Sequence, residues 1–538
     1  MMWYSFKIPL RKPAIRHMKI ENFSLLLKTK ISHYKPAFLL ILFGAMVSIL
    51  YSVYFARTII TTPYEIGLRE GAPQVLTGLL LSGKNPYVFD NNPLAYNTYG
   101  ILHNFVMVPF AYAFGNTLHV HRWVSFIFIL LSTTVGFWVI FQRRQSISLA
   151  SIGAAFFMIG FIGLGGIGSS PTTLGTFLFL CTLYIPYLRS YDNKSLIASA
   201  FFALLALHTK AYNVLAWGIV VSYIFLFVSK KKAFQYALYF SGFFLGTFPI
   251  LRIFFPLYLV NVFGGNISNT FRTLEHLLTQ LMWLTIYFSP ILVLTLLAFW
   301  ESLRKSRYFF SAIRFNLTAW DTPLLNIDLD YFLYAPLVAI TAFILVLGSH
   351  VGNFLSYTYE MVVSTFLIWF FTNYDNKKPL SVLASLVIIM NLLAWQFVTL
   401  NPNMLEIKDS FAWEKLYKTI KPTKNILNSP VFTSRAMELG ITPVDSGRTI
   451  YFYTMKPYPE NLLFGPPYED YLRIGEEYAQ KVNETIKNKG YDLIYITKEM
   501  EVFYDLDLVK ENYEMTDQLI LYMSATNQKW VVQIWEPK

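Results

Sequence analysis

Charged residues are scarce in this sequence. Asp, Glu, Lys and Arg fill 14% of its 538 positions, whereas a soluble domain has about one quarter. Apolar residues make up 55% and aromatic residues 18%. This composition excludes a soluble protein over most of the chain and predicts a polytopic α-helical membrane protein. From about residue 400 onward the composition becomes that of a soluble domain, so we place the domain boundary at Asn401 and Pro402.

Cysteine and nucleotide-binding motifs are also lacking. Cys181, the single cysteine, excludes an internal disulfide and a thiolate metal site, and its apolar neighbours predict a small core hydrophobe. His119 and His121 form an H-x-H without a third ligand nearby in the sequence, which disfavours a metal site. The glycines of MIGFIGLGGIGSS lack the Gly-Lys-Ser/Thr ending of a phosphate loop, and they are typical of close helix packing instead.

Apolar runs of roughly 20 residues, the length that crosses a bilayer, recur along the chain and predict about eleven spans. A further apolar segment at 99–114 is short and carries His103 and Pro109, which favours an interfacial or re-entrant helix. If it crosses, or if a run is miscounted, the number rises to about thirteen at most. The eleven runs lie near 37–58, 122–141, 148–166, 172–188, 195–209, 211–229, 233–251, 281–300, 331–347, 352–372 and 379–398.

The net charge of +12 reflects lysines and arginines at the ends of apolar runs, which is a topology signal and does not indicate a nucleic-acid partner. Residues 1–36 are rich in Lys and Arg, so we expect a cytoplasmic N-terminus in a plasma or inner membrane. After this segment, clusters of Lys and Arg recur in every second connection between apolar runs. The alternation places the first long loop, 59–121, and the tail, 401–538, together on the extracytoplasmic side.

The tail has the pattern of a small α/β domain. Short strands are predicted at 426–433, 449–454, 493–497 and 530–534. An amphipathic helix is predicted at 470–489, ending at Gly490. The chain is therefore divided into a cytoplasmic N-terminus (1–36), a transmembrane domain (37–400) and a soluble extracytoplasmic domain (401–538).

The first external loop carries most of the ionisable groups that could support chemistry. A carboxylate beside a guanidinium at the mouth of a helix bundle suits general-base work, while neighbouring cations could hold a departing phosphate. The alternative is a solvated loop with an incidental pair of charged neighbours. The ionisable groups are Glu65, Arg69, Glu70, Lys84 and Asp90.

Other predicted external joints add polar groups. Lys210 and His208 interrupt apolar sequence, and an ionisable residue there is a candidate site residue, although Lys210 could also extend to the interface. Arg252 has the same two interpretations. The joint LGSHVGNFLSYTYE offers His350, Asn353, Tyr357 and Glu360, of which Tyr357 also fits an interfacial aromatic belt.

An ordered set of short motifs runs through these segments. It comprises Glu70-Gly71, Gly83-Lys84-Asn85-Pro86-Tyr87, Tyr99-Gly100-Ile101-Leu102, Arg122, Ser170-Pro171-Thr172-Thr173-Leu174-Gly175, His208-Thr209-Lys210 and the polar residues of 348–360. The set, which spans most of 37–372, resembles the GT-C superfamily of membrane glycosyltransferases. It is most similar to glycosyltransferase family 39, with the protein O-mannosyltransferases and aminoarabinose transferases.

This resemblance implies transfer of a sugar from a polyprenyl-phosphate donor to a glycan, lipid or protein acceptor outside the cytoplasm, with inversion. A lipid phosphate is a competent leaving group, so one base plus cations suffices, unlike the two-carboxylate scheme of glycosidases. The implied roles are Glu70 as general base with Glu65 in reserve, Arg69, Lys84, Arg122 and Lys210 as donor-phosphate clamp, and Tyr99, His350 and Tyr357 as sugar or acceptor contacts.

Two departures from the family pattern bear on cofactors. Ile101 stands where relatives have proline. Thr172 or Thr173 stands where relatives carry a second carboxylate, which in them binds a metal or the acceptor. We therefore expect no cofactor and favour a metal-independent enzyme over one that uses a divalent metal.

Three other classes of protein stay open at this point. A transporter or flippase of lipid-linked sugars would explain embedded charges but not the soluble tail. A polysaccharide polymerase or ligase would depend on a later, larger loop. A structural or receptor protein would tolerate charge changes in the first loop.

The alternating basic joints predict where the C-terminus lies. A reporter fused after Lys538 should be active only on the extracytoplasmic side, and a fusion at residue 36 only on the cytoplasmic side. A cytoplasmic signal from the C-terminal fusion would contradict the eleven-span topology.

Overall fold

The computed structural model of the protein describes residues 36–66, 70–88, 91, 99–163, 167–259, 261–262, 273–305, 315–316, 319–325, 329–347, 359–374, 384–388, 410–421, 424–427, 433–441, 468–497, 505–523 and 528–538. Several predicted features lie outside these residues. They are the basic N-terminus, Arg69, Asp90, His350, Asn353, Tyr357, the strand at 449–454 and the boundary at Asn401 and Pro402.

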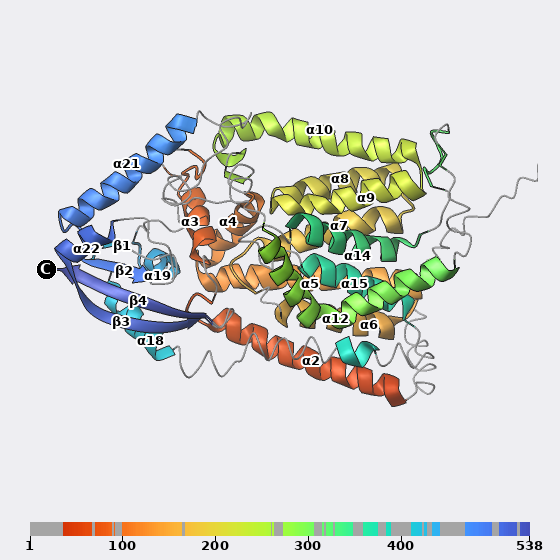
Figure 1. The fold of residues 1–538 in the computed structure, drawn as a ribbon, viewed down its shortest axis with the longest axis horizontal. Coiled ribbons are helices and arrows are strands. Elements are labelled where there is room, and N and C mark those ends of the chain that lie inside the picture. Colours follow the sequence, from red (N-terminus) through yellow and green to blue (C-terminus); the bar gives the residue numbers. More distant parts are fainter. Residues whose placement is uncertain are drawn as a thin grey trace, which may run out of the picture.

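Helices make up most of the described chain, and a small sheet follows near its C-terminus (Figure 1). The helices before the sheet are α2 (Pro36–Thr61), α3 (Gly71–Leu81), α4 (Leu102–Phe114), α5 (Leu118–Arg144), α6 (Ile147–Gly163), α7 (Thr172–Leu188), α8 (Asn193–Leu207), η4 (Ala211–Val214), α9 (Leu215–Phe227), α10 (Lys230–Phe254), α12 (Leu274–Lys305), α14 (Tyr331–Ala342), η6 (Phe343–Leu347) and α15 (Tyr359–Asn373).

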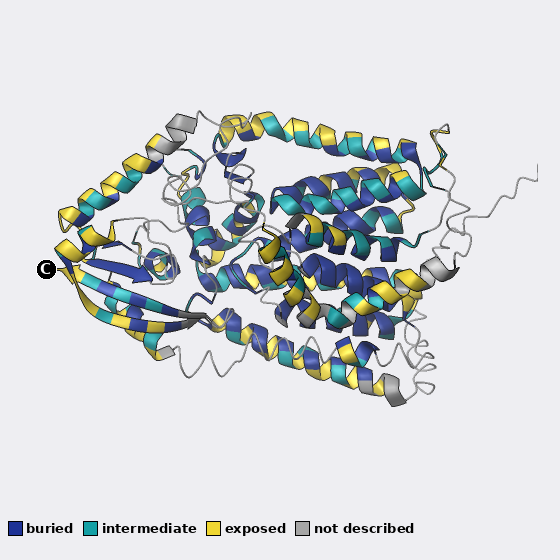
Figure 2. Cartoon of the chain, viewed as in Figure 1, coloured by how far each residue is buried: buried dark blue, intermediate teal, exposed yellow. Residues whose placement is uncertain are grey.

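Long apolar helices make this an integral membrane protein. Among the described residues, three helices have the length and composition to cross a bilayer, at Ile41–Thr61, Leu118–Arg144 and Lys230–Phe254, and shorter apolar helices accompany them. Large apolar side chains are exposed along the outer helices α2 and α10 (Figure 2), such as Leu50 at 65% and Ile253 at 72%. Contiguous apolar surface of this kind is suited to lipid contact. The number of spans and their orientation stay predictions.

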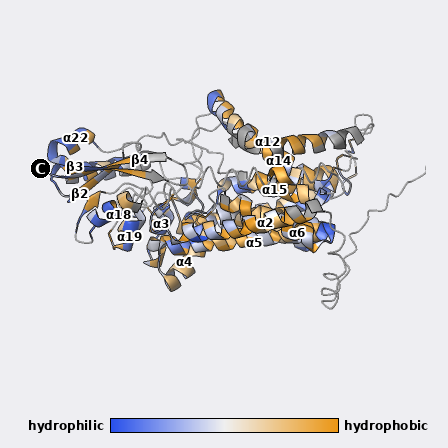
Figure 3. Cartoon of the chain, turned by 90° about the horizontal axis from the view of Figure 1, so that it is seen from below, coloured by the Kyte–Doolittle hydropathy of each residue, from blue (hydrophilic) through white to orange (hydrophobic). Residues whose placement is uncertain are grey.

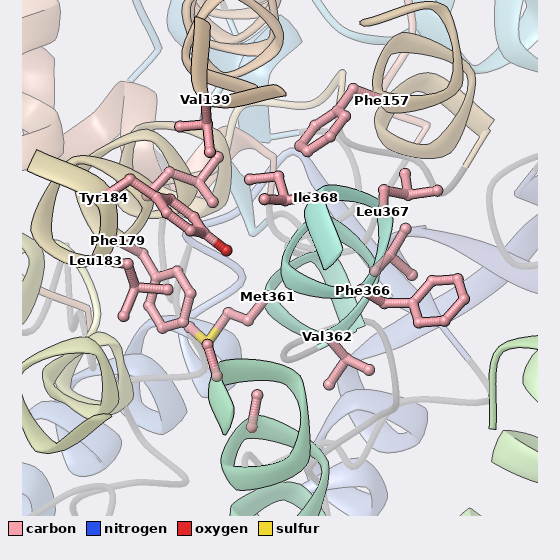
Figure 4. Packing of buried hydrophobic residues seen from close by; sticks show 14 of the residues in the cluster. Val139, Phe157, Phe179, Leu183, Tyr184, Met361, Val362, Phe366, Leu367 and Ile368 are labelled. Atoms are coloured by element: carbon pink, nitrogen blue, oxygen red, sulfur yellow. The ribbon is translucent and has the colours of Figure 1, made fainter. Parts of the chain in front are cut away.

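The core of the bundle lies where α5, α6, α7 and α15 pack together (Figure 4). Small residues allow the close approach of α5 and α6. A Cβ atom at Gly136 would lie 2.8 Å from the ring of Phe157, and one at Gly153 would overlap Ile140. α5 and α6 are therefore held together by the fit of their side chains, because lipid provides no hydrophobic driving force between membrane helices.

The first predicted external loop is folded. It contains α3 and α4, which pack on each other, and α4 also contacts α5. Both short helices lie between the helix bundle and the C-terminal sheet (Figure 1). The picture of an open, solvated loop at 59–121 is therefore wrong for its described part. Whether α4 crosses the membrane stays open.

The C-terminal part is a four-stranded sheet in the order β1-β2-β4-β3. β1 runs parallel to β2, whereas β4 is antiparallel to both β2 and β3. This end of the molecule is more hydrophilic than the bundle (Figure 3). The elements are α18 (Ser410–Thr419), β1 (Ile426–Leu427), α19 (Thr433–Glu438), α21 (Tyr468–Lys487), β2 (Leu493–Thr497), α22 (Leu506–Asn512), β3 (Tyr513–Met523) and β4 (Gln528–Pro537).

Strand alternation builds a core on each face of this sheet. Leu493 and Tyr495 pack with Trp413 of α18, whereas Ile494 and Ile496 pack with the apolar residues of α21. Successive side chains of a strand point to opposite faces, so β2 is covered on both sides.

The predicted elements of the tail agree with the structure in part. The strand at 493–497 is β2, the one at 530–534 lies within β4, and the helix at 470–489 is α21. The strand at 426–433 is wrong at its end, because Thr433 begins helix α19. β3 was not predicted, because polar residues fill its first half and only pairing with β4 makes it a strand.

The C-terminal part docks on the folded loop through α18 and α19. Tyr64 stacks on Trp413 with ring centroids 5.6 Å apart, and the hydroxyl of Tyr417 donates to the carbonyl of Pro63 at 3.4 Å. α19 packs on α3 so closely that a Cβ atom at Gly71 would lie 2.6 Å from that of Thr433. The end of α2, α3 and the sheet domain thus form one continuous layer.

This close contact predicts the effect of adding a methyl group. Gly71→Ala should destabilise the docked layer by about 1–3 kcal/mol through overpacking. Gly218→Ala is the matched control, since it also adds a methyl to a helix but meets nothing within 4 Å. Thermal unfolding in detergent and protease sensitivity of the C-terminal part measure the difference. Equal behaviour of the two variants would refute the tight contact.

Candidate functional site

Glu70 and Arg122 form a buried ion pair. Glu70 directly precedes α3, and Arg122 lies near the start of α5. Arg122 Nη2 and Nε donate to the two carboxylate oxygens at 2.8 and 3.2 Å. The Arg122 side chain is fully buried and that of Glu70 is 6% exposed. The pair is bidentate, which is the strongest geometry for a guanidinium and a carboxylate.

The remaining donors of Arg122 bind the end of α2. Nη1 donates to the carbonyls of Ile59 and Thr62, at 2.9 and 2.6 Å, and Nη2 donates to that of Tyr64 at 2.6 Å. A guanidinium has five N–H groups, and all five are used. Donation to a phosphate would cost one of these bonds. The geometry therefore indicates a structural role for Arg122 and disfavours the predicted phosphate clamp.

The carboxylate of Glu70 accepts two further bonds from the backbone. The N–H of Ile66 donates to Oε2 at 2.7 Å, and that of Ser169 donates to Oε1 at 3.1 Å. A Cβ atom at Gly168 would lie 3.3 Å from Oε1, so a larger residue would crowd this approach. Glu70 thus joins the loop after α2, helix α5 and the segment before α7.

A second polar network lies beside this pair. His121 forms hydrogen bonds with the Ser169 hydroxyl at 2.9 Å and with Asn116 Oδ1 at 3.0 Å. Asn116 in turn donates to the carbonyl of Gln74 in α3 at 2.8 Å. In the sequence, His121 is a candidate only for a metal site, and no pattern singles out Ser169. Their role here is to tie α3, α5 and the start of α7 together.

Glu65, the reserve base, lies at the contact with the C-terminal domain. Its Oε1 accepts the backbone N–H of Ser434 at 2.7 Å, and Oε2 has no hydrogen bond among the described residues. Burial raises the pKa of the Glu65 carboxyl well above its usual range, and the nearby charge of Glu70 adds to this effect. Glu65 is therefore a carboxyl that readily holds a proton.

Lys210 is the central cation of a second cluster. It lies in the joint between α8 and η4, it is buried, and its ammonium donates to the Thr172 hydroxyl. The rings of Tyr99 and Tyr212 face the ammonium at 5.2 and 5.4 Å. Burial lowers the pKa of the Lys210 ammonium to about 8, opposed by the negative charge of Glu360.

Glu360 completes this cluster from the start of α15. Its carboxylate accepts the Thr176 hydroxyl at 3.2 Å, and that hydroxyl also bonds the Thr172 carbonyl at 3.0 Å. Glu360 was noted in the sequence but not chosen as a site residue. Its position within apolar sequence could have identified it, because a carboxylate in a membrane segment usually has a nearby partner.

Two predicted motifs meet at Lys210. The backbone N–H of Gly100 donates to the Thr209 carbonyl at 2.9 Å, and that of Leu102 donates to the His208 carbonyl at 3.0 Å. A Cβ atom at residue 100 would overlap the His208 carbonyl, so this pairing requires glycine. This backbone pairing places the ring of Tyr99 next to the Lys210 ammonium.

Other predicted residues are not seen in these two clusters. Lys84 is exposed in the turn after α3, and Arg252 is exposed near the end of α10. No group of three His, Cys, Asp or Glu side chains that could hold a metal ion occurs in the described part of the chain.

Comparison with known proteins identifies the fold. No protein-family model matches the chain, and no curated protein matches it. The crystal structure of ArnT from Cupriavidus metallidurans in the apo state matches with a TM-score of 0.53 and 11% identity, covering 91% of this chain and 97% of that chain. ArnT bound to undecaprenyl phosphate has the same identity and coverage and a TM-score of 0.49. The chain therefore shares the fold of ArnT, as the GT-C resemblance implies, and membership of the GT-C superfamily and of family 39 stays a prediction.

The buried pair predicts strong coupling between its partners. Glu70→Gln or Arg122→Met should each destabilise the protein by about 3–5 kcal/mol, because either leaves an uncompensated buried group. The double variant Glu70→Met/Arg122→Met should cost clearly less than the two single changes together.

The partly exposed pair of Arg435 and Glu438, whose atoms lie 3.3 Å apart, provides the control. Glu438→Gln should change stability by about 1 kcal/mol at most. Denaturant unfolding of the purified protein in detergent measures all variants. Additive effects at positions 70 and 122 would contradict the pairing.

Proposed function

We propose that this protein is a membrane glycosyltransferase that transfers a sugar from a polyprenyl-phosphate donor to an extracytoplasmic glycan, lipid or protein acceptor. The observation that carries the proposal is the buried ammonium of Lys210, placed beside a folded first loop that holds two buried carboxylates. The GT-C fold shared with ArnT over nearly the whole chain supports it.

Lys210 is proposed to bind the donor phosphate. A buried ammonium flanked by aromatic rings and hydroxyls is weakly hydrated and attracts an anion. Thr172 fixes the position of the ammonium, and Glu360 keeps the cluster near neutrality before a phosphate arrives. Tyr99, held by the Gly100 backbone, would contact the phosphate or the first sugar.

Glu70 is proposed as the base that deprotonates the acceptor hydroxyl, and the anomeric carbon is inverted as the phosphate departs. Its four hydrogen bonds orient the carboxylate, but one must open to admit the acceptor. Glu65 fits the alternative assignment, because its Oε2 has no hydrogen-bond partner among the described residues and could accept a proton from the acceptor hydroxyl.

Glutamine substitution separates the two assignments. If Glu70 is the base, Glu70→Gln should remove transfer even from the fraction that stays folded, whereas Glu65→Gln should keep measurable transfer. Activity per folded molecule, with a panel of polyprenyl-phosphate sugars in proteoliposomes, decides between them. Full transfer by both variants would overturn carboxylate catalysis from this loop, and loss of transfer in chelator would overturn the proposed metal independence.

Phosphate binding should depend on pH through Lys210. The ammonium carries its charge below a pKa of about 8 and loses it above, so affinity for undecaprenyl phosphate should fall as pH rises from 7 to 9. Lys210→Met should weaken binding at pH 7 on the order of tenfold or more.

Lys210→Arg is the matched control. A guanidinium stays charged throughout this range, so the arginine variant should lose less affinity between pH 7 and pH 9 than the wild-type protein does. Titration of each variant in nanodiscs with undecaprenyl phosphate measures the affinities. A wild-type protein with the same affinity at both pH values would count against Lys210 as the phosphate ligand.

A further inference from the structure

His103 is a buried histidine without a partner. It lies in the first turn of α4 and is 2% exposed, and neither ring nitrogen has a hydrogen bond among the described residues. The buried histidine beside it differs, because both nitrogens of His121 are bonded. Leaving a buried polar group unpaired costs about 1–3 kcal/mol. A ligand that supplies the missing bonds would remove this cost.

The ring of His103 lies near His121, with ring centroids 6.2 Å apart. The residue before it, Leu102, donates its backbone N–H to the His208 carbonyl, which brings the start of α4 to the joint that carries Lys210. The residue after His103, Asn104, donates to the Pro73 carbonyl at 2.8 Å and to the Thr77 hydroxyl at 3.1 Å. These bonds fix α4 against α3, so His103 is positioned by the fold.

The same polar layer contains a second unpartnered acceptor. Gln74 is fully buried in α3, and its Oε1 has no hydrogen bond among the described residues. Its backbone carbonyl accepts from Asn116, which also bonds His121. Unsatisfied polar atoms therefore lie on both α3 and α4, next to the His121 network.

The chemistry of these groups selects a class of ligand. A neutral imidazole offers one donor and one acceptor, which matches a hydroxyl group. A cation is disfavoured by the charge of Lys210, and an anion would be drawn to that ammonium instead. Metal binding lacks support, since the described residues contain no group of three ligands.

We infer that His103 binds a hydroxyl of the sugar carried by the lipid donor and so determines which sugar is accepted. The inference rests on the proposed function for the identity of the donor. Lys210 is the proposed phosphate ligand, and the backbone pairing of Leu102 with His208 brings the first turn of α4, which carries His103, to the Lys210 joint, where a sugar attached to that phosphate would be placed. His103 is thus a specificity residue separate from the proposed base.

Binding measurements test this role directly. The probes are bare undecaprenyl phosphate and undecaprenyl phosphates carrying a hexose, a pentose or an aminopentose, titrated against protein in nanodiscs. His103→Leu should weaken the best glycosylated probe on the order of tenfold and leave the bare lipid within about twofold. His103→Asn keeps a donor and an acceptor, so it should retain part of the preference.

Stability provides a readout that does not depend on the substrate. His103→Leu should leave Tm unchanged or raise it, because an apolar side chain of similar size removes an unpaired polar group. His121→Leu is the control, since it breaks the bonds to Ser169 and Asn116 and should lower Tm.

The outcomes separate this inference from the proposed function. If the wild-type protein binds bare undecaprenyl phosphate without preferring any glycosylated probe, the role of His103 fails and the phosphate site stands. If it binds neither the bare lipid nor any glycosylated probe, the proposed phosphate site and the role of His103 are both refuted. A Tm loss in His103→Leu as large as that in His121→Leu would show that the ring already has partners, and would also overturn the inference.

Discussion

The described part of the molecule depends on one buried ion pair. Arg122 uses all five of its N–H groups, two on Glu70 and three on backbone carbonyls at the end of α2. Neither charge could stay in a low-dielectric interior without such saturation, because desolvation would exceed the gain from a single contact. The pair therefore fixes where the first membrane helix ends, how α3 starts and where α5 begins.

The rest of the candidate functional site is built on that layer. The Glu70 carboxylate also holds the segment before α7, which carries Ser169 and leads to Thr172, the partner of Lys210. On the other side, α18 and α19 of the sheet domain cover the same loop through Tyr64, Glu65 and Gly71. A domain that looks separate in sequence thus contributes to the surroundings of a candidate base.

The polar groups of this layer divide into two kinds. Glu70, Arg122 and His121 are saturated with hydrogen bonds and give the layer its shape. Glu65 and His103 keep buried polar atoms without partners among the described residues, and Lys210 is a buried ammonium with a lowered pKa. Functional sites commonly tolerate such unfavourable groups because a ligand or a reaction step uses them. Glu70 is the exception among the saturated groups, because it is also the proposed base and must open one of its four hydrogen bonds to act.

The sequence by itself determined the membrane class, most helix positions, strand β2 and helix α21, and it singled out Glu70, Tyr99 and Lys210 as candidate site residues, because hydropathy, strand alternation and charge in apolar surroundings are local signals. Only the tertiary structure decided which of these side chains bind one another. Arg122 lies 52 residues from Glu70 and Glu360 lies 184 residues from Thr176, so no local pattern could pair them. The saturation of Arg122, the isolation of His103 and the docking of α19 on α3 follow from packing between distant segments, which a single sequence does not record.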